Sequence, residues 1–388
     1  MDKQNLFQKI KAYFSNKEPL PPGMYTFQNP SDEGEQYRLH LRIEKDGSGI
    51  LVINAATVLH LNQTAVEFAY HIIQQTDVDV MIAEVSQRYQ VDSSQIKADF
   101  VAFKDKVDTL IHTPDLDPVS YLGIERQDPY SVEISAPYRM DCALTYHVGE
   151  DSHKEHAPLD RVDRELSTEE WGIILKKAAN IGIPHVLFTG GEPTLREDLP
   201  DLILQAEELG LVTGLLTDGL KLGEDDYLNT LLMNGLDHLM IVFDPNKQEM
   251  WQILGKVFPE DIFTTVHLTL RKGEALRPHI KRLAEMGANA LSLSIVDKDM
   301  NEKLQELRDA AAVLQLDLVW DLPVPYSCNN PVALELEEAA DSQEPPEGAG
   351  KAWLYVEPDG DVLPTQGMYD QIMGNFLTDP WEDIWKRK

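Results

Sequence analysis

The stretch PHVLFTGGEPTLREDLPDLILQAEELGLVTGLLTDG, residues 184–219, decides the fold. Its first part, HVLFTG, is a short apolar run typical of a buried strand, and it ends in Gly190-Gly191-Glu192-Pro193. Two successive glycines let backbone carbonyls approach a ligand that any side chain would obstruct. Carbonyl oxygens and the Glu192 carboxylate together make an acceptor-rich strand end, which suits an ammonium group. We therefore expect these residues to bind a ligand.

Strand and helix signals alternate along the chain around this stretch, with short apolar runs separated by amphipathic segments. The expected strands are VEIS (132–135), HVLFTG (185–190), VTGLLT (212–217), HLMIVFD (238–244), TTVHLTL (264–270) and ALSLSIV (290–296). The expected helices cover 168–180, 199–209, 227–233, 275–286 and 300–314. This order predicts an α/β fold with a parallel sheet, as a partial (β/α)6-type or full barrel over residues 132–325. Chemistry is then expected at the carboxyl ends of the strands.

The ordered set of motifs resembles the radical S-adenosylmethionine (SAM) family. ELSTEEW (165–171) looks like the family helix before the GGEP strand, TLREDL (194–199) like the helix after it, and LLTDG (215–219) like the next strand end. In that family the GGEP motif holds the amino group of SAM. Other polar residues at or near expected strand ends are either further SAM contacts implied by the resemblance or ordinary loop residues. The implied cofactor-binding residues are Gly190, Gly191, Glu192, Pro193, Asp218, Asp244 and Ser292.

The cluster element that defines this family is missing. The family carries C-x3-C-x2-C after the first barrel strand, and these three thiolates hold a [4Fe-4S] cluster. The corresponding text here is residues 135–147, with Met140, Leu144 and His147 in register with the three cysteines. Leu144 cannot bind iron, Met140 offers only a weak thioether, and His147 alone is a plausible ligand. We therefore expect no iron-sulfur cluster and no radical chemistry.

The remaining cysteines and histidines leave one alternative open. Cys142 and Cys328 are the two cysteines of the chain, and we expect both to be buried thiols in a reducing compartment. A metal site built from His147, His153 and His156, with acidic residues between them, is possible for zinc or non-haem iron. A solvated polar loop explains the same residues.

An N-terminal module precedes the barrel. Residues 38–54 alternate apolar and polar positions around Asp46-Gly47, which predicts a hairpin. Three amphipathic helices follow, beginning after the capping residues Asn62 and Thr64. This order resembles the PqqD-like element that binds leader peptides of ribosomally made, modified peptides, and a generic winged-helix-like fold is the alternative.

The C-terminal part contains a second departure from the family. WLYVEPDGDVLP predicts a hairpin and, with the residues after it, resembles the SPASM extension of peptide-modifying radical SAM enzymes, where a cysteine normally follows the turn. Thr365, Gln366 and Met368 occupy that region, so auxiliary clusters are also expected to be absent. The expected boundaries are 1–37 for an N-terminal segment, 38–112 for the module, 113–131 for a linker, 132–325 for the barrel, 326–350 for an acidic loop and 351–388 for the tail.

Composition narrows the class of partner. The 388 residues include 34 Lys+Arg and 66 Asp+Glu, and the net charge of -32 opposes binding to nucleic acid or anionic lipid. No apolar run approaches the roughly 20 residues of a membrane helix, and the N-terminus lacks a secretory signal. We expect a cytoplasmic protein whose partner is a basic peptide or a small molecule.

These features predict a non-radical relative of the radical SAM and SPASM enzymes. The expected role is an accessory or scaffold protein that binds SAM or a nucleoside, together with a leader peptide or a partner maturase. Two alternatives stay open: a non-radical or metal-dependent enzyme on the same barrel, and an active radical SAM maturase whose cluster is held atypically.

Overall fold

The computed structural model describes residues 20–29, 37–54, 57–89, 91–113, 116, 118–123, 133–149, 158–295, 298–319 and 347–387. The chain divides into two compact units, residues 1–128 and 129–388. Among the described residues, no helix has both the length and the apolar character needed to cross a membrane.

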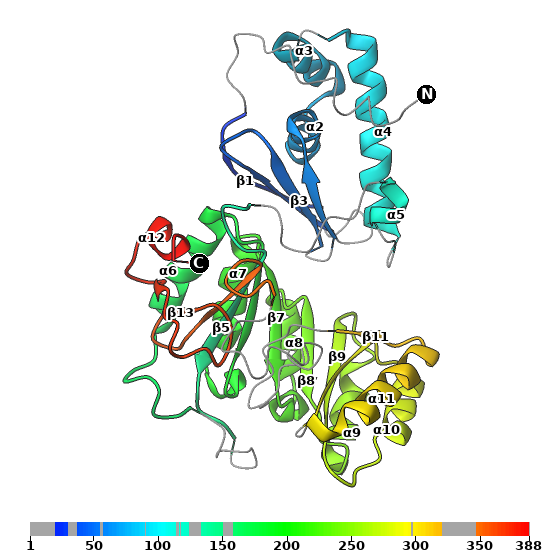
Figure 1. Ribbon diagram of the computed structural model, residues 1–388, viewed down its shortest axis with the longest axis vertical. Coiled ribbons are helices and arrows are strands. Elements are labelled where there is room, and N and C mark those ends of the chain that lie inside the picture. The colour runs from blue at the N-terminus through cyan, green and yellow to red at the C-terminus, as the bar shows by residue number, and fades with distance from the viewer. Residues whose placement is uncertain are drawn as a thin grey trace. The chain divides into compact units, whose positions relative to one another are not determined.

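The first unit is a four-stranded antiparallel sheet with helices packed on it (Figure 1). The sheet has the order β1 (Gly23–Gln28), β2 (Arg38–Ile43), β3 (Gly49–Ile53), β4 (Thr57–Leu61). The helices are α2 (Gln63–Ile73), α3 (Val78–Tyr89), α4 (Ser93–His112) and α5 (Pro118–Leu122). Asn62 caps α2 by accepting a hydrogen bond from Ala65 N at 3.0 Å. The β2–β3 hairpin and three helices agree with the sequence pattern, whereas β1, β4 and α5 were not expected.

The second unit is built on one ten-stranded sheet with the order β11-β10-β9-β8-β7-β6-β5-β12-β13-β14. Neighbouring strands from β5 to β11 are parallel, β12 is parallel to β5, and β13 and β14 are antiparallel additions. The strands are β5 (Arg139–Thr145), β6 (His185–Gly190), β7 (Val212–Thr217), β8 (His238–Val242), β9 (Phe263–Leu270), β10 (Ala290–Ile295), β11 (Asp317–Leu318), β12 (Trp353–Val356), β13 (Asp361–Leu363) and β14 (Gly374–Asn375). The α/β class with a parallel sheet is confirmed.

Helices connect successive parallel strands, so that β5 to α11 make six strand-helix units. The helices are α6 (Thr168–Ile181), α7 (Leu199–Glu208), α8 (Tyr227–Met233), α9 (Gln248–Val257), α10 (Arg277–Met286), α11 (Asn301–Val313) and α12 (Trp381–Trp385), with 3₁₀ turns η2 (Pro193–Leu195), η3 (Leu220–Gly223) and η4 (Lys298–Met300). A capping box starts α6: Ser167 Oγ accepts from Glu170 N, and the Glu170 carboxylate accepts from Ser167 N. The described strands form an open sheet, as in the partial (β/α)6 form (Figure 1).

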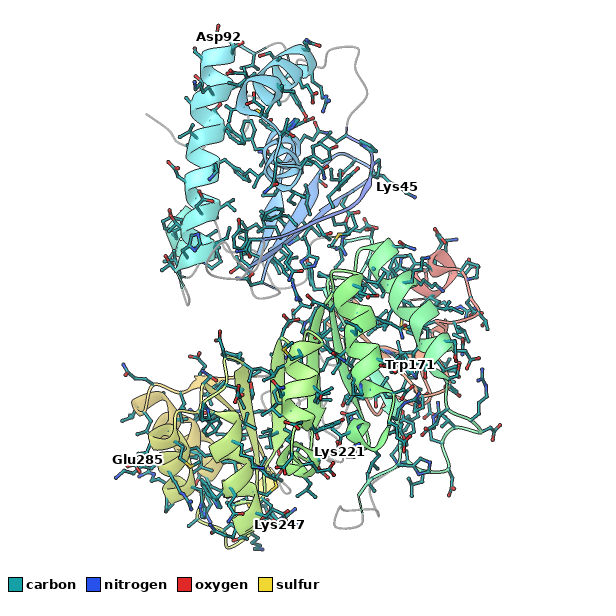
Figure 2. All side chains as sticks on the ribbon, turned by 180° about the vertical axis from the view of Figure 1, so that it is seen from behind. Lys45, Asp92, Trp171, Lys221, Lys247 and Glu285 are labelled. Atoms are coloured by element: carbon teal, nitrogen blue, oxygen red, sulfur yellow. The ribbon has the colours of Figure 1, made fainter. Side chains whose placement is uncertain are left out.

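The two faces of this sheet differ in chemistry. Apolar side chains on one face pack with helices α6 to α11 in a single core, in which Trp171 of α6 is fully buried (Figure 2). Full burial of each large apolar side chain stabilises the fold by about 1.5–3 kcal/mol. The opposite face carries polar pairs: Arg139 with Asp141, and His185 with His238, whose Nε2 atoms lie 2.6 Å apart.

The sequence assignment of the first barrel strand is wrong. Residues 133–135 are not a strand; the carbonyls of Ile134 and Ser135 accept hydrogen bonds, both 3.1 Å long, from two α12 tryptophans, Trp385 and Trp381. The first strand is β5. It was missed because Arg139 and Asp141 interrupt its apolar pattern, and the structure pairs these charges with each other at 2.7 Å.

Candidate functional site

The turn after β6 depends on a close approach between two neighbouring strands. Gly190 has φ +121°, and a Cβ at this position would lie 2.2 Å from Thr145 O of β5. The amide of Gly191 donates to the same Thr145 carbonyl at 2.6 Å, and Glu192 N donates to His147 O at 2.8 Å. The first glycine is therefore required by the neighbouring strand itself.

Glu192 joins the ends of β6 and β7. One carboxylate oxygen accepts hydrogen bonds from the Thr194 amide and hydroxyl and from the Thr217 hydroxyl at 2.7 Å. The other accepts from Asp218 N at 2.6 Å. Burial, and next the charge of Asp218, raise the pKa of Glu192 to about 7. The carboxylate thus holds two strand ends together, instead of standing free for a ligand as its sequence position had implied.

An acceptor remains at this turn. The buried Gly191 carbonyl accepts no hydrogen bond from any residue in the described part of the chain. Pro193 is buried and starts η2, and the Thr194 carbonyl that follows accepts from Lys221 Nζ at 2.8 Å. Lys221 also lies over the Tyr227 ring, 4.7 Å from its centroid. Its ammonium group is therefore engaged by the Thr194 carbonyl and the Tyr227 ring.

Sequence reasoning missed three members of this site. The side chains of Thr194 and Thr217 complete the bonding of the carboxylate, and Lys221 ties η3 to η2. The available signal was position: Thr194 directly follows GGEP, and Thr217 directly precedes Asp218 at the next strand end.

The other residues named from the sequence lie apart from this turn. Asp244 follows β8, and its Oδ1 accepts from Asn246 N at 3.0 Å in the turn that leads to α9. Ser292 is buried within β10, with its hydroxyl 3.0 Å from Nδ1 of His267. Burial lowers the pKa of His267 to about 3, so its imidazole is neutral. The structure places Asp218 against Glu192, whereas neither Asp244 nor Ser292 has a direct bond to that turn.

The register assigned to the missing cluster is also corrected. Met140 and Leu144 lie inside β5, are fully buried, and point into the helix-side core. An element that follows the first strand must begin after Thr145. His147 does follow it; its side chain is 74% exposed, and its Nε2 lies 3.9 Å from Glu165. The other proposed metal ligands, His153 and His156, lie outside the described residues.

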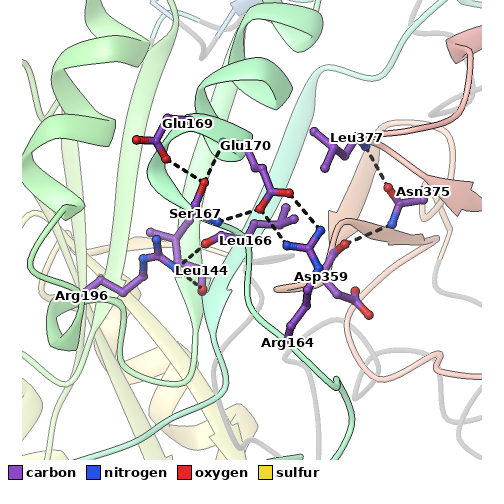
Figure 3. Close-up of polar contacts among 10 residues, drawn as sticks. All are labelled: Leu144, Arg164, Leu166, Ser167, Glu169, Glu170, Arg196, Asp359, Asn375 and Leu377. Atoms are coloured by element: carbon purple, nitrogen blue, oxygen red, sulfur yellow. Dashed lines mark hydrogen bonds and ion pairs between the residues drawn. The ribbon is translucent and has the colours of Figure 1, made fainter.

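The residues at the end of β5 are bonded to residues 165–166, which precede α6. The Glu165 carboxylate accepts hydrogen bonds from the Thr145 hydroxyl at 2.5 Å and from Tyr146 N at 3.3 Å. Arg196 donates to the carbonyls of Leu144 and Leu166, at 3.2 and 3.0 Å (Figure 3). Side chains therefore tie the end of β5 to the residues that precede α6.

Comparison with known proteins agrees with the strand-end geometry. Residues 142–273, which include β6 and its GGEP turn, match the radical SAM superfamily. The chain is similar to this superfamily over these residues. Over 85 residues the sequence is 41% identical to the PqqA peptide cyclase of Granulibacter bethesdensis and 44% identical to that of Bradyrhizobium diazoefficiens. Each alignment covers 22% of this chain and 22% of the relative, so the match spans about a fifth of those proteins.

Solved structures share the fold over a longer stretch. Streptococcus suis SuiB bound to S-adenosylmethionine has a TM-score of 0.59 at 16% identity, covering 89% of this chain and 86% of SuiB. SuiB bound to its precursor peptide SuiA has a TM-score of 0.58 at 15% identity, with coverages of 92% and 88%. At such identities the likeness concerns the fold.

The residues present in the region that matches the radical SAM superfamily do not fit a [4Fe-4S] cluster. Such a cluster takes three thiolates in this family, and the sequence has two cysteines in all. Cys142 is fully buried in β5 against the helices, and burial together with Asp141 raises the pKa of its thiol. Cys328 lies outside the described residues. No set of three His, Cys, Asp or Glu side chains suited to a metal occurs in the described ranges.

Proposed function

We propose that this protein is a non-radical relative of the radical SAM peptide-modifying enzymes. It binds SAM or a related nucleoside together with a peptide, and serves as an accessory or scaffold protein in a peptide or cofactor maturation pathway. One observation carries the proposal: the GGEP strand end is fully assembled in a chain that has two cysteines.

The chemistry of the strand end supports a cationic ligand. The buried Gly191 carbonyl is a suitable acceptor for an ammonium group, and the next residue, Glu192, is bonded to Asp218 at the neighbouring strand end. Lys221, the nearby base of η3, is turned toward the Thr194 carbonyl and the Tyr227 ring. SAM carries both an ammonium and a sulfonium group, so its charge matches this edge.

The first unit supports a peptide partner. Its sheet has two edge strands, β1 and β4, and an edge strand can pair with an extended peptide. SuiB, whose fold resembles this one, has been crystallised with its precursor peptide. A PqqD-like role for this unit in binding a leader peptide remains part of the proposal.

The test combines metal analysis with ligand titration on the full chain. After anaerobic iron-sulfur reconstitution, we expect background iron only. Calorimetry on the same sample should show binding of SAM, and weaker binding of S-adenosylhomocysteine, which lacks the sulfonium charge. Several irons per chain would instead favour an active maturase with an atypically held cluster. One metal per chain after aerobic purification would favour a metal-dependent enzyme.

A charge variant with a matched control ties SAM binding to the strand end. Asp218→Asn removes one negative charge beside Glu192, and we expect SAM to bind about tenfold more weakly. Asp225→Asn makes the same change at an exposed position seven residues along the chain and should leave affinity unchanged. Equal affinities for both variants would place SAM elsewhere, and no SAM binding by the unaltered protein would leave only a peptide-binding role.

A further inference from the structure

A buried carboxylate in the tail contacts the segment that follows β5. Glu357 comes directly after β12, the tail strand that pairs with β5, and its side chain is 1% exposed. Its Oε1 accepts hydrogen bonds from the Tyr146 hydroxyl at 2.9 Å and from Arg161 Nε at 3.0 Å, and its Oε2 accepts from Arg161 Nη2 at 2.9 Å. These two partners lie near opposite ends of the segment after β5.

The same network extends further into the tail. Arg161 also donates to Tyr369 O at 3.1 Å, and its guanidinium lies over the Tyr369 ring, 5.1 Å from the centroid. Leu166 N donates to Pro358 O at 2.7 Å. The tail turn that carries Glu357 is thus bonded to the segment through side chains and backbone.

A second residue stiffens the turn itself. Asn375 of β14 donates to Asp359 O, and its own side-chain oxygen accepts from Leu377 N (Figure 3). The same side chain also donates to the Asp361 carboxylate. Gly360, at φ +93°, lets the turn pass close to Asn375, because a Cβ there would lie 3.1 Å from its amide. The hairpin that carries the Glu357 carboxylate is therefore held by hydrogen bonds of its own.

A bidentate arginine pair with a buried carboxylate is among the stronger polar contacts in proteins, and removal of one partner leaves the other buried without its bonds. Tyr146 is 3% exposed, and burial raises the pKa of its phenol, so the hydroxyl stays a donor. Tyr146 and Arg161 share Glu357 as their acceptor, so removal of its carboxylate would leave both donors without these bonds.

We propose that Glu357, Arg161 and Tyr146 form a clasp by which the tail holds residues 146–149 and 158–166, which follow β5, without any metal. Radical SAM enzymes hold a cluster with three thiolates after the first strand; in this chain the clasp, together with Glu165 and Arg196, holds the described residues at that place. The inference concerns how the segment is held and stands whether or not SAM binds.

Hydrogen exchange measured by mass spectrometry on the full chain tests the clasp. In the unaltered protein, exchange over residues 158–166 should be the same with and without a strong iron and zinc chelator. In Glu357→Gln, exchange should rise about tenfold over 158–166 and over 361–369 together, while β6 to β10 keep their protection. Asp370→Asn, the same change at an exposed tail position, should match the unaltered protein.

A milder variant keeps the test decisive if Glu357→Gln fails to fold. Tyr146→Phe removes one hydroxyl, and we expect a smaller rise over the same two stretches. Loss of protection on chelation would overturn the clasp, because a metal would then hold the segment. Unchanged exchange in the variants, or a uniform rise that also covers β6 to β10 in Tyr146→Phe, would overturn it as well.

Discussion

The carboxyl ends of β5 and β6 lie side by side in one sheet, with Thr145 opposite Gly190, yet different interactions order them. The end of β6 is ordered by its own backbone and by one carboxylate, through the close approach at Gly190 and the four hydrogen bonds to Glu192. The described residues after β5 are instead bonded to side chains from distant elements, among them Arg196 and Glu357.

This difference bears on the two motifs of the strand ends: GGEP is present, and the three-cysteine element is absent. Protein groups make all the bonds described above for the GGEP turn. The cluster element has no such independence, since it consists of its thiolates. In the proposed function, the chain therefore lacks the cluster while the neighbouring strand end stays assembled.

The largest expected effect comes from the turn after β6. Gly190→Ala places a methyl group 2.2 Å from the Thr145 carbonyl at a φ that disfavours side chains, so we expect a loss of about 3–5 kcal/mol in the free energy of unfolding. Gly255→Ala, in α9 with open space around the position, should be neutral or stabilise by up to about 1 kcal/mol. Urea denaturation followed by circular dichroism measures both, and similar losses would contradict the special role of Gly190.

A pH experiment sharpens the comparison at Glu192. Its pKa rises from 4.5 to about 7, so between these pH values the folded state holds a proton that the unfolded state releases. Stability from this group therefore falls as pH rises through that window, by roughly 3 kcal/mol. Glu192→Gln lacks this titrating group. Between pH 4.5 and 7, its free energy of unfolding should therefore rise relative to that of the unaltered protein. Glu208→Gln, at an exposed position, should show no such trend; a parallel course for Glu192→Gln would refute the assignment.

His267 of β9 should make the free energy of unfolding depend on pH in the opposite direction. Its pKa falls from 6.5 to about 3, so the unfolded state takes up a proton that the folded state refuses. Stability should fall as pH drops below 6.5, by roughly 3 kcal/mol at pH 4.5. His267→Gln should flatten this limb of the stability curve, and His279→Gln should keep it. The assignment fails if both variants behave alike.

Cys142 gives the smallest effect and separates a core residue from a metal ligand. Cys142→Ala removes one buried sulfur from the helix-side core, so we expect a loss of about 1 kcal/mol in the free energy of unfolding. Iron content after reconstitution should not change. A fall in bound iron would mean that this thiol does serve a cluster, and that β5 does not have the arrangement described above.

Much of the fold could be predicted from local patterns. Strands β6 to β10 are short and rich in apolar residues, with helical segments between them, and GGEP stands out at the end of β6. The pattern failed at β5, where the charged residues Arg139 and Asp141 alternate with apolar ones, and this error displaced the cluster register by several residues. The pairing of β12 with β5 has no local signal, because more than 200 residues separate the partners in sequence.

The site was predictable in position and not in detail. The roles of Gly190 and Glu192 depend on Thr145 and on Thr217 and Asp218, which other strands supply. The Arg161–Glu357 pair joins residues 196 positions apart, so composition and spacing contain no trace of it. The number of cysteines could be read from the sequence, because it does not depend on how the chain is aligned with the three-cysteine element.

The central claim is that the strand-end site is assembled without a cluster, and iron counting with SAM titration on one reconstituted sample tests it most directly. The account predicts background iron and a measurable SAM affinity that Asp218→Asn weakens. About four irons per chain, with SAM binding only after reconstitution, would contradict it.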